Sequence, residues 1–320
     1  MRGGIYLKIF DGHCDVLYKL FINPTLDFCQ SAELQVNLER LNSSGTRVQL
    51  FAIYVPESVH PDLKFEAALR MVDLFYEKVL SPNPQMKLVT NRAEIGQLAE
   101  NEIGALLTLE GCDAIGQDLL KLRTLLRLGV RSVGLTWNYA NHVADGAMEE
   151  RGAGLTKFGR QVVQLLNETK TACDVSHLSE RGFWDVLEVA ESVFASHSNS
   201  YVKCPHPRNL RDDQIKELIK RNSVIGITFV PEFLSGRKET ASIDDVLRHL
   251  DHICSLGGEN HVGFGSDFDG IEFTVKNLSG NEQYENLCNE LQKYYTDIQV
   301  RKFLYENMAA RLPLQSGLVQ

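Results

Sequence analysis

A short stretch near the start of the sequence, Asp11-Gly-His13-Cys-Asp15, has residue types that could bind a metal ion. It follows an apolar run at 5–10 that predicts a β-strand. Residues two apart on a strand project to the same face, so His13 and Asp15 are expected to point the same way. Imidazole and carboxylate groups are both ligands of zinc. A single His-x-Asp pair is not specific, and a metal site would need further ligands.

Further metal-binding side chains follow other strand-like runs. Glu110 follows the run at 104–109, and His177 follows the run at 171–175. His197 follows the run at 193–196, and Asp267 follows the run at 261–265. If these strands are parallel neighbours, their carboxyl ends meet on one face. So many polar groups buried together would be unfavourable unless a cation bound among them.

The number of candidate ligands favours two metal ions over one. A catalytic zinc ion takes three protein ligands and a water molecule, whereas this sequence offers His13, Asp15, Glu110, His177 and His197. If Glu110 bridges, His13 and Asp15 complete one site, and His177 and His197 complete the other. A hydroxide shared by two zinc ions forms near neutral pH and is the nucleophile of many hydrolases. We therefore expect two zinc ions per chain, bridged by Glu110.

The elements that must position these residues alternate regularly along the chain. Apolar, β-branched runs predict eight strands, at 5–10, 48–54, 104–109, 132–136, 171–175, 193–196, 224–229 and 261–265. Helical patterns lie between them, at 62–80, 91–100, 116–128, 157–168, 180–190, 212–221, 242–256 and 281–309, the last expected to be two helices. Ser242-Ile-Asp-Asp245 resembles a helix capping box. Eight β–α units predict a single (β/α)8 TIM barrel over residues 1–320, with catalytic residues at the carboxyl ends of the strands.

Two other interpretations of these patterns are weaker. A doubly wound open sheet also alternates strands and helices, but no Gly-x-Gly-x-x-Gly follows the first strand. The run Asp267-Phe-Asp269-Gly270 has the start of a calcium loop, but Ile271 and Leu278 occupy later ligand positions. The remaining histidines are either interpreted as structural (His60, His249, His252 and His261) or placed in loops near the barrel mouth with an open role (His142 and His206).

Composition restricts the class of protein. The chain has 320 residues, 43% of them hydrophobic, and a net charge of −9 without a Lys/Arg-rich run. Nucleic acid and anionic membrane surfaces are therefore not expected partners. No stretch has the roughly 18 apolar residues that span a bilayer, and no signal peptide is expected. Seven scattered cysteines without a Cys-x-x-Cys motif indicate a reduced, cytoplasmic protein.

Together, the motifs resemble a known enzyme family. Asp-Gly-His13-Cys-Asp15, Leu-Glu110-Gly, Asp-Val-Ser-His177, Ser-His197-Ser, Arg208-Asn209 and Gly-Phe-Gly-Ser-Asp267-Phe-Asp-Gly are similar to motifs of the membrane dipeptidases. These enzymes, also called renal-type dipeptidases, are a zinc branch of the amidohydrolase superfamily. The segment Gly154-Leu-Thr-Lys-Phe-Gly159 is also similar, and the resemblance extends over about 9–311.

The resemblance implies a di-zinc (β/α)8 barrel that hydrolyses dipeptides, including many with a C-terminal D-residue. Arg208 matches the arginine that binds the C-terminal carboxylate of the substrate, for which a guanidinium is well suited. Asp267 matches the residue that transfers a proton from the bridging water to the leaving amine. A tyrosine near the substrate carboxylate corresponds to Phe233 here. A substrate-contacting histidine of the mammalian enzymes corresponds to Trp137.

The expected function is thus a cytoplasmic zinc dipeptidase, and relatives of this kind are commonly homodimers. Asn138 or His142 is expected to replace the missing histidine in contacting substrate. Three alternatives stay open at this point: a related hydrolase acting on a lactone or cyclic amide, a peptidase that processes larger peptides, and a non-catalytic binding protein on the same fold. The metal ligands with Asp267 favour an enzyme, and Arg208 favours a substrate with a free carboxylate.

Overall fold

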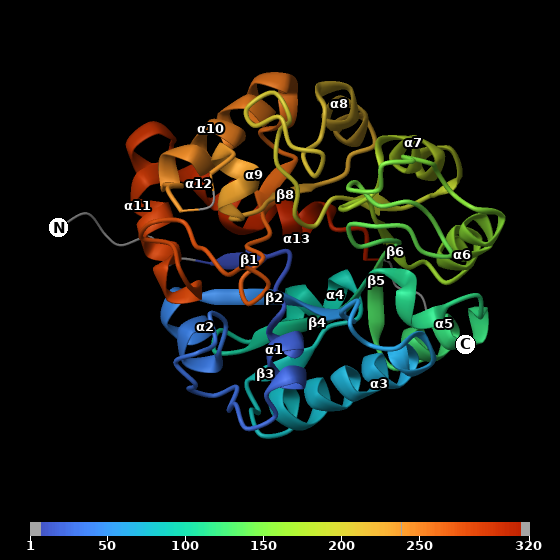
Figure 1. Ribbon diagram of the computed structural model, residues 1–320. Helices are drawn as coiled ribbons and strands as arrows, with labels where there is room; N and C mark the ends of the chain where they lie inside the picture. Colours follow the sequence, from blue (N-terminus) through green and yellow to red (C-terminus); the bar gives the residue numbers. More distant parts are fainter. Residues whose placement is uncertain (1–7, 238, 315–320) are drawn as a thin grey trace.

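The strands of the computed structural model, which describes residues 8–237 and 239–314, form a nearly closed parallel barrel (Figure 1). Around the barrel, the strand order is β7-β6-β5-β4-β2-β1-β9-β8. A parallel bridge between Ala195 and Ile225 connects the two ends of this series. The strands are β1 (Ile9–Asp11), β2 (Thr46–Tyr54), β4 (Ile103–Glu110), β5 (Val130–Gly134), β6 (Ala172–Asp174), β7 (Val193–Phe194), β8 (Ile225–Ile227) and β9 (Val262–Phe264). This topology confirms the predicted (β/α)8 barrel.

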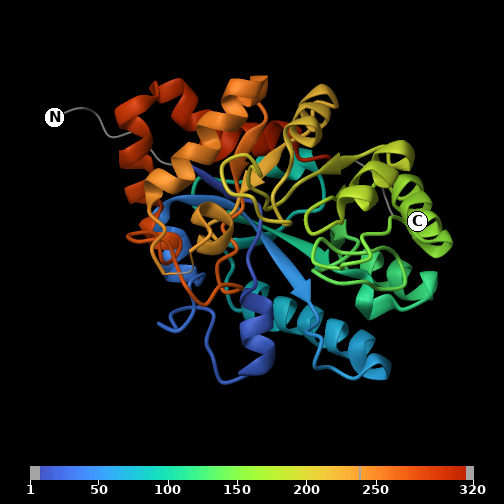
Figure 2. The ribbon, with the colours of Figure 1, turned by 45° about the horizontal axis from the view of Figure 1, so that its top comes forward.

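Helices surround the strands, and the colours of Figures 1 and 2 run around this ring in chain order. The α-helices are α1 (Val16–Ile22), α2 (Leu38–Ser44), α3 (Lys64–Leu74), α4 (Arg92–Gln97), α5 (Leu119–Arg127), α6 (Lys157–Glu168), α7 (Glu180–Val189), α8 (Asp212–Lys220), α9 (Pro231–Ser235), α10 (Ile243–Ile253), α11 (Tyr284–Tyr294), α12 (Asp297–Arg301) and α13 (Asn307–Arg311). Short 3-10 or π segments are η1 (Pro61–Leu63), η2 (Phe75–Leu80), η3 (Cys112–Ile115), η4 (Cys254–Gly258), η5 (Asn281–Gln283) and η6 (Lys302–Glu306). No helix in the described part of the chain has both the length and the apolar character needed to cross a membrane.

Several element boundaries differ from the predicted ones. The predicted first strand lies partly at 5–7, outside the described residues, and β1 continues to Asp11. An additional short strand, β3 (Met86–Leu88), pairs with the first three residues of β4. The range 281–309 contains α11 and then a continuous helical stretch of α12, η6 and α13, so the two predicted helices are present and the second has a π-helical middle turn. Three-residue strands and π turns of this kind are set by tertiary contacts, which sequence periodicity does not report.

Helices α1, α2 and α9 were not predicted, although two of them have clear local signals. In α2, the side chain of Asn37 accepts a hydrogen bond from the Arg40 N–H at 2.9 Å, and Gly45 ends the helix with a φ of 76°. Helix α9 has Pro231 in its first turn and Gly236 at its end. The predicted capping box at α10 is confirmed, since the Asp245 carboxylate accepts from the Ser242 N–H at 2.8 Å.

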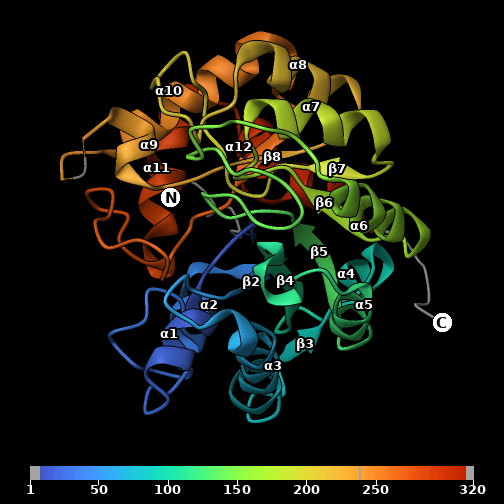
Figure 3. The same ribbon diagram turned by 45° about the vertical axis from the view of Figure 1, so that its right-hand side comes forward.

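Apolar side chains pack in two clusters that hold the barrel together. The larger cluster lies between the strands and the surrounding helices. The smaller cluster joins side chains of several strands, including Phe10, Leu50 and Phe194, to Met308 and Leu312 at the C-terminal end of the described chain. Figure 3 shows the surrounding helices from a second side. Because this packing fixes the strands, the loops after their carboxyl ends start from a rigid frame.

Candidate metal centre

The structure brings all of the predicted metal ligands to the carboxyl ends of the strands. His13 follows β1, and Glu110 is the last residue of β4. His177 and His197 follow β6 and β7, and Asp15 precedes the first residue of α1. Asp15 is thus at a helix start rather than on the strand, yet its Oδ2 lies 3.4 Å from His13 Nε2. Each of these side chains is buried.

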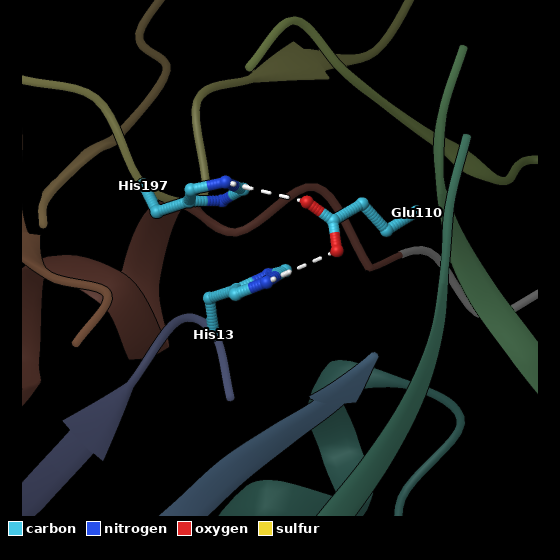
Figure 4. Close-up of side chains that lie close together, drawn as sticks. All are labelled: His13, Glu110 and His197. Atoms are coloured by element: carbon cyan, nitrogen blue, oxygen red, sulfur yellow. Dashed lines mark ion pairs between the residues drawn. The ribbon is translucent and has the colours of Figure 1, made fainter. Parts of the chain in front are cut away.

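Glu110 lies at the centre of the cluster, with histidines facing both of its carboxylate oxygens. Its Oε2 is 3.5 Å from His13 Nε2, whereas its Oε1 is 2.9 Å from His177 Nε2 and 3.6 Å from His197 Nε2. Figure 4 shows His13 and His197 approaching the carboxylate side by side, with their ring centroids 3.9 Å apart. The two oxygens therefore face different histidines, as a bridging carboxylate requires.

Hydrogen bonds on the outer sides of two rings direct their Nε2 atoms inward. His177 Nδ1 contacts Asn138 Oδ1 at 2.9 Å, and His197 Nδ1 contacts Ser196 Oγ at 2.6 Å. An amide oxygen only accepts, so His177 Nδ1 is the donor and Nε2 of the neutral ring has a lone pair. That lone pair faces a Glu110 oxygen at 2.9 Å. Two lone pairs that face each other require a proton or a metal ion between them.

Unpaired buried atoms give a second indication of a metal. Among the described residues, His13 Nε2 and Asp15 Oδ1 have no hydrogen-bond partner although both are buried. Buried polar atoms are normally paired, because leaving one unpaired costs about 1–3 kcal/mol. Nitrogen and carboxylate oxygen are both zinc donors. The residues present therefore fit the metal that the sequence predicts.

The distances between donor atoms form two sets of ligands that share His13, whereas the predicted two sites share Glu110. Donor atoms within 4.8 Å of one another form two sets, one of His13, Glu110 and His197, and one of His13, Asp15 and Asp267. His13 belongs to both sets, and Asp267 Oδ1 lies 3.8 Å from His13 Nε2. Asp267, predicted as a proton-transfer residue, is thus also within reach of the metal ligands.

The electrostatics of the cluster favour a bound cation. Burial alone would lower the pKa of His13, but the carboxylates of Glu110 and Asp15 outweigh it and raise that pKa well above its usual value. Burial would raise the pKa of Glu110, but His13 and His177 hold it well below its usual range. Burial, assisted by Arg208, lowers the pKa of His177 to about 3. His177 is therefore neutral near pH 7, which is the form that binds a metal.

Two residues of the site have unusual backbone conformations. His177 has a φ of 69° and Asp267 a φ of 66°. Side chains other than glycine rarely adopt this left-handed region, which costs on the order of 1–3 kcal/mol in strained sites. Close strand contacts add a further constraint, since a Cβ on Gly226 or Gly265 would lie 2.0 Å from the Ser196 carbonyl oxygen. These glycines let the loop that carries His197 approach its neighbours.

A cavity of about 250 Å³ opens beside the cluster. Asp15, Glu110, His177 and Asp267 lie in its wall together with three of the predicted substrate contacts, Trp137, Asn138 and Phe233. Tyr54 also lines it and packs against Trp137 at 5.3 Å between ring centroids. Tyr54 was not predicted from the sequence. It is nevertheless the last residue of β2, and functional residues of a barrel are expected at the carboxyl ends of its strands.

Arg208 lies on the other side of His177. It lines a neighbouring cavity of about 410 Å³, which shares His177 with the first. The guanidinium is buried, donates to the His197 carbonyl oxygen at 3.2 Å, and lies 5.4 Å from the Phe233 ring. Its Nε has no hydrogen-bond partner among the described residues. Arg208 therefore keeps a buried donor that is not used within the described chain.

The remaining histidines lie outside the cluster. His142 is exposed and does not line the first cavity, so the structure does not bring it together with the other predicted substrate contacts. His206 accepts from the Arg208 N–H at 3.2 Å and packs on Phe233. The predicted structural histidines contact neighbouring backbone or side chains: His60 with Asp62, His249 with Ser200 and Leu234, His252 with Asp212, and His261 with Ser223.

Comparisons with known proteins agree with this geometry. A model of the family described as membrane dipeptidase, peptidase family M19, matches residues 6–311. An uncharacterized protein in the pqqA 5′ region of Klebsiella pneumoniae is 34% identical over 235 residues, 70% of this chain and 86% of that protein. Two solved structures each superpose with a TM-score of 0.91 and cover 97% of this chain and 99% of the other. They are the dipeptidase AC, a family M19 metallopeptidase with 30% identity, and a metallopeptidase of Rhodobacter sphaeroides with 28% identity.

Proposed function

Because the chain belongs to the membrane dipeptidase family, peptidase family M19, we propose that it hydrolyses dipeptides with two zinc ions bridged by Glu110. Members of this family are metal-dependent hydrolases. In the proposal, His13 and Asp15 complete one zinc site with Glu110, and His177 and His197 complete the other. Bound zinc supplies Lewis acidity, which polarises the scissile carbonyl and lowers the pKa of the attacking water.

The observation that carries the proposal is the position of Glu110 between two groups of ligands. Its Oε2 faces His13 at 3.5 Å and its Oε1 faces His177 at 2.9 Å. A carboxylate that served a single ion would not need buried histidines facing both oxygens. The unpaired Nε2 of His13 and Oδ1 of Asp15 add free donors on the Oε2 side.

Arg208 is proposed to bind the C-terminal carboxylate of the dipeptide. Its buried guanidinium has an unpaired Nε, and a carboxylate can accept two parallel hydrogen bonds from such a group. The guanidinium lies beside the His197 backbone and the Phe233 ring. A dipeptide whose carboxylate is bound by Arg208 would extend past the metal ligands into the cavity lined by Trp137 and Tyr54.

Asp267 is proposed to transfer the proton from the attacking water to the leaving amine. Its Oδ1 lies 3.8 Å from His13 Nε2, and Thr228 Oγ1 contacts its Oδ2 at 3.5 Å. Burial raises the pKa of Asp267 and the Glu110 carboxylate adds to this, whereas His13 and Arg208 oppose it. A carboxylate with a raised pKa is a stronger base, so it takes a proton from the attacking water more readily than an ordinary aspartate does.

The cavity suits a small substrate, because about 250 Å³ lies near the lower end of the range for ligand pockets. The Rhodobacter sphaeroides neighbour was solved with a phosphinate mimic of L-Ala-D-Ala. On that basis we propose that this chain also accepts dipeptides with a C-terminal D-residue. A substrate of this kind presents both a peptide bond to the metal ligands and a free carboxylate to Arg208.

The test is hydrolysis of paired L-L and L-D dipeptides by protein whose zinc content has been measured. We expect turnover that a chelator abolishes and added zinc restores, with L-D dipeptides hydrolysed as well as their L-L counterparts. Protein carrying two zinc ions per chain that hydrolyses no dipeptide would contradict the proposal and direct the assay to lactones and cyclic amides. Hydrolysis of L-L dipeptides without any hydrolysis of L-D dipeptides would contradict only the proposed acceptance of a D-residue.

A homodimer and a cytoplasmic location are further proposals, supported by the family resemblance and by the composition of the chain. Light scattering coupled to size-exclusion chromatography would test the dimer, which predicts twice the 36.0 kDa mass of one chain. Fractionation of the source cells would test the location.

A further inference from the structure

We propose that two buried aspartates, Asp11 and Asp174, are positioning residues that act through backbone hydrogen bonds. Asp11 holds the ligand His13 beside Asp267, and Asp174 holds the ligands His177 and His197. This inference rests on the two-metal function proposed above. Neither aspartate lines the 250 Å³ cavity, and neither belongs to the two sets of close donor atoms among the described residues. Each is the last residue of a strand, Asp11 in β1 and Asp174 in β6.

Asp174 connects the loops that carry two histidine ligands. Its Oδ1 accepts hydrogen bonds from the Ser176 N–H and the Ser196 N–H, both at 3.0 Å. Ser176 directly precedes His177, and Ser196 directly precedes His197. The Ser176 hydroxyl in turn accepts from the His197 N–H at 3.2 Å. One carboxylate oxygen therefore sets the start of both loops, which come from neighbouring strands.

Asp11 makes the same arrangement on the other side of the centre. Its Oδ1 accepts from the His13 N–H at 3.2 Å and from the Ser266 N–H at 2.8 Å. Ser266 directly precedes Asp267, and its hydroxyl donates to the His13 carbonyl oxygen at 3.1 Å. Strand β1 pairs with β9 beside this contact, through Asp11 and Phe264. This oxygen therefore holds His13 and Asp267 together.

The two arrangements share one further feature. In each, the aspartate accepts from the serine that precedes a residue with positive φ, His177 in one case and Asp267 in the other. A backbone in this rarely adopted conformation needs surrounding contacts that keep it there. Both aspartates supply such a contact at the residue before the strained one, so removing the acceptor should displace the ligands rather than merely loosen a distant loop.

The separation of the two networks predicts separate effects on the two ions. Removing the acceptor at Asp174 should weaken the site of His177 and His197, and removing it at Asp11 should weaken the site of His13 and Asp15. Groups that orient metal ligands typically change metal affinity by about 10–100-fold when they are mutated. We expect a loss of that size at one ion and little change at the other.

Zinc affinities of Asp11→Ala and Asp174→Ala, measured by competition with a chromophoric chelator, test the inference. Anomalous scattering from crystals grown at limiting zinc then identifies which ion has lost occupancy. Asp11→Asn and Asp174→Asn keep an acceptor oxygen in the same place and should restore the affinity. Asp245→Ala is the matched control, since Asp245 is also buried and accepts a backbone hydrogen bond, but at the start of α10. We expect its zinc affinity to be that of the wild type.

Equal weakening of both ions in each alanine variant, or asparagine variants as weak as the alanine ones, would overturn the inference. If an alanine variant does not fold, Asp11→Glu and Asp174→Glu keep the charge but move the acceptor oxygens, and the same selective loss is expected. Wild-type protein that binds fewer than two zinc ions at these ligands would instead refute the two-metal function. Wild-type protein with two ions and variants with unchanged affinities would refute this inference alone.

Discussion

Buried histidines occur in two different environments in this molecule, one at the candidate metal centre and one on the buried face of helix α10. His249 is fully buried, and both of its ring nitrogens are paired with backbone groups. Its Nδ1 accepts from the Ser200 N–H and its Nε2 donates to the Leu234 carbonyl oxygen, each at 3.0 Å. At the candidate metal centre, in contrast, His177 Nε2 faces a carboxylate oxygen and the Nε2 of His197. His13 Nε2 has no hydrogen-bond partner among the described residues.

The difference shows that burial of a histidine does not by itself indicate a functional site. Relative exposure is 0% for His249, 1% for His197, 3% for His13 and 6% for His177, so burial does not separate the two environments. What separates them is the group that the second ring nitrogen faces. In His249 it donates to a backbone carbonyl oxygen, whereas His177 Nε2 lies 2.7 Å from His197 Nε2 and 2.9 Å from Glu110 Oε1. A nitrogen paired with the backbone stabilises the fold, whereas nitrogens that face one another and a carboxylate leave a position that a cation would fill.

Substitution of the carboxylate that faces these nitrogens should have the largest effect. Glu110→Gln replaces a charged oxygen by an amide nitrogen that cannot bind a metal, so we expect turnover to fall below detection and zinc content to drop below two ions per chain. Metal analysis together with a dipeptide assay measures both quantities. A circular dichroism melt controls for folding. Retention of two zinc ions and of turnover would show that Glu110 is an ordinary buried carboxylate and not a metal ligand.

Asp267→Asn should separate the binding of metal from the transfer of a proton. The amide keeps the size of the side chain but cannot accept a proton, so we expect kcat to fall by about 10²–10⁴-fold. Both zinc ions should stay bound, because Asp267 is not among the five proposed ligands. Steady-state kinetics and zinc analysis on the same sample test this prediction. Loss of one zinc ion from the variant would show that Asp267 is a ligand, as its inclusion in the set with His13 and Asp15 also allows.

Arg208→Ala should act on one class of substrate only. The loss of a charged hydrogen-bond pair is expected to lower kcat/KM for dipeptides by about 10–100-fold, mainly through KM. The same dipeptides with a C-terminal amide lack the carboxylate and provide the control. Their kcat/KM in the variant should equal that in the wild type. An equal loss for both substrates would assign Arg208 to the support of His197, whose carbonyl oxygen it contacts at 3.2 Å.

A smaller effect is expected from the outer side of the His177 ring. Asn138→Ala removes the partner of Nδ1, a 2.9 Å contact, and should lower zinc affinity by about 10–100-fold. At saturating zinc, kcat should recover most of its wild-type value. A chelator competition and a zinc titration of turnover test the two parts. Unchanged zinc affinity with a raised KM would restore Asn138 to the role of a substrate contact, which was the sequence-based prediction.

Much of the barrel and of the candidate metal centre could be predicted, because most of the site residues directly follow strand-like runs in the sequence. Glu110, His177 and His197 each follow an apolar run, and parallel strands of a barrel end on one face. The two sets of close donor atoms, which share His13, could not be predicted, since they depend on how each side chain is oriented at the end of its strand. The contact of Asn138 with His177 joins residues 39 positions apart and has no sequence signal. Helix α1 was missed because it begins at Val16, directly after the motif ends, and is only seven residues long.

The smallest effect on activity is expected at the paired histidine. His249→Gln cannot preserve both backbone hydrogen bonds, so we expect the free energy of unfolding to fall by about 1–3 kcal/mol. Zinc content and kcat of the folded protein should be unchanged, because neither nitrogen of His249 faces the centre. Chemical denaturation and the dipeptide assay measure these quantities. A variant that lost zinc without losing stability would mean that His249 supports the candidate metal centre rather than the fold.

The free energies of unfolding of the wild type and of His249→Gln should also depend differently on pH. Burial lowers the pKa of His249 from 6.5 to about 4 in the folded protein. The unfolded chain therefore takes up its proton at higher pH than the folded chain, and the stability that neutral His249 provides is lost as pH falls from about 6.5 to 4. Over that range the stability advantage of the wild type over His249→Gln should shrink by on the order of 3 kcal/mol. Parallel curves of unfolding free energy against pH for the two proteins would mean that His249 is not held neutral by its backbone partners. Hydrogen bonding to the backbone would then no longer explain why His249 is structural and the other buried histidines face the candidate metal centre.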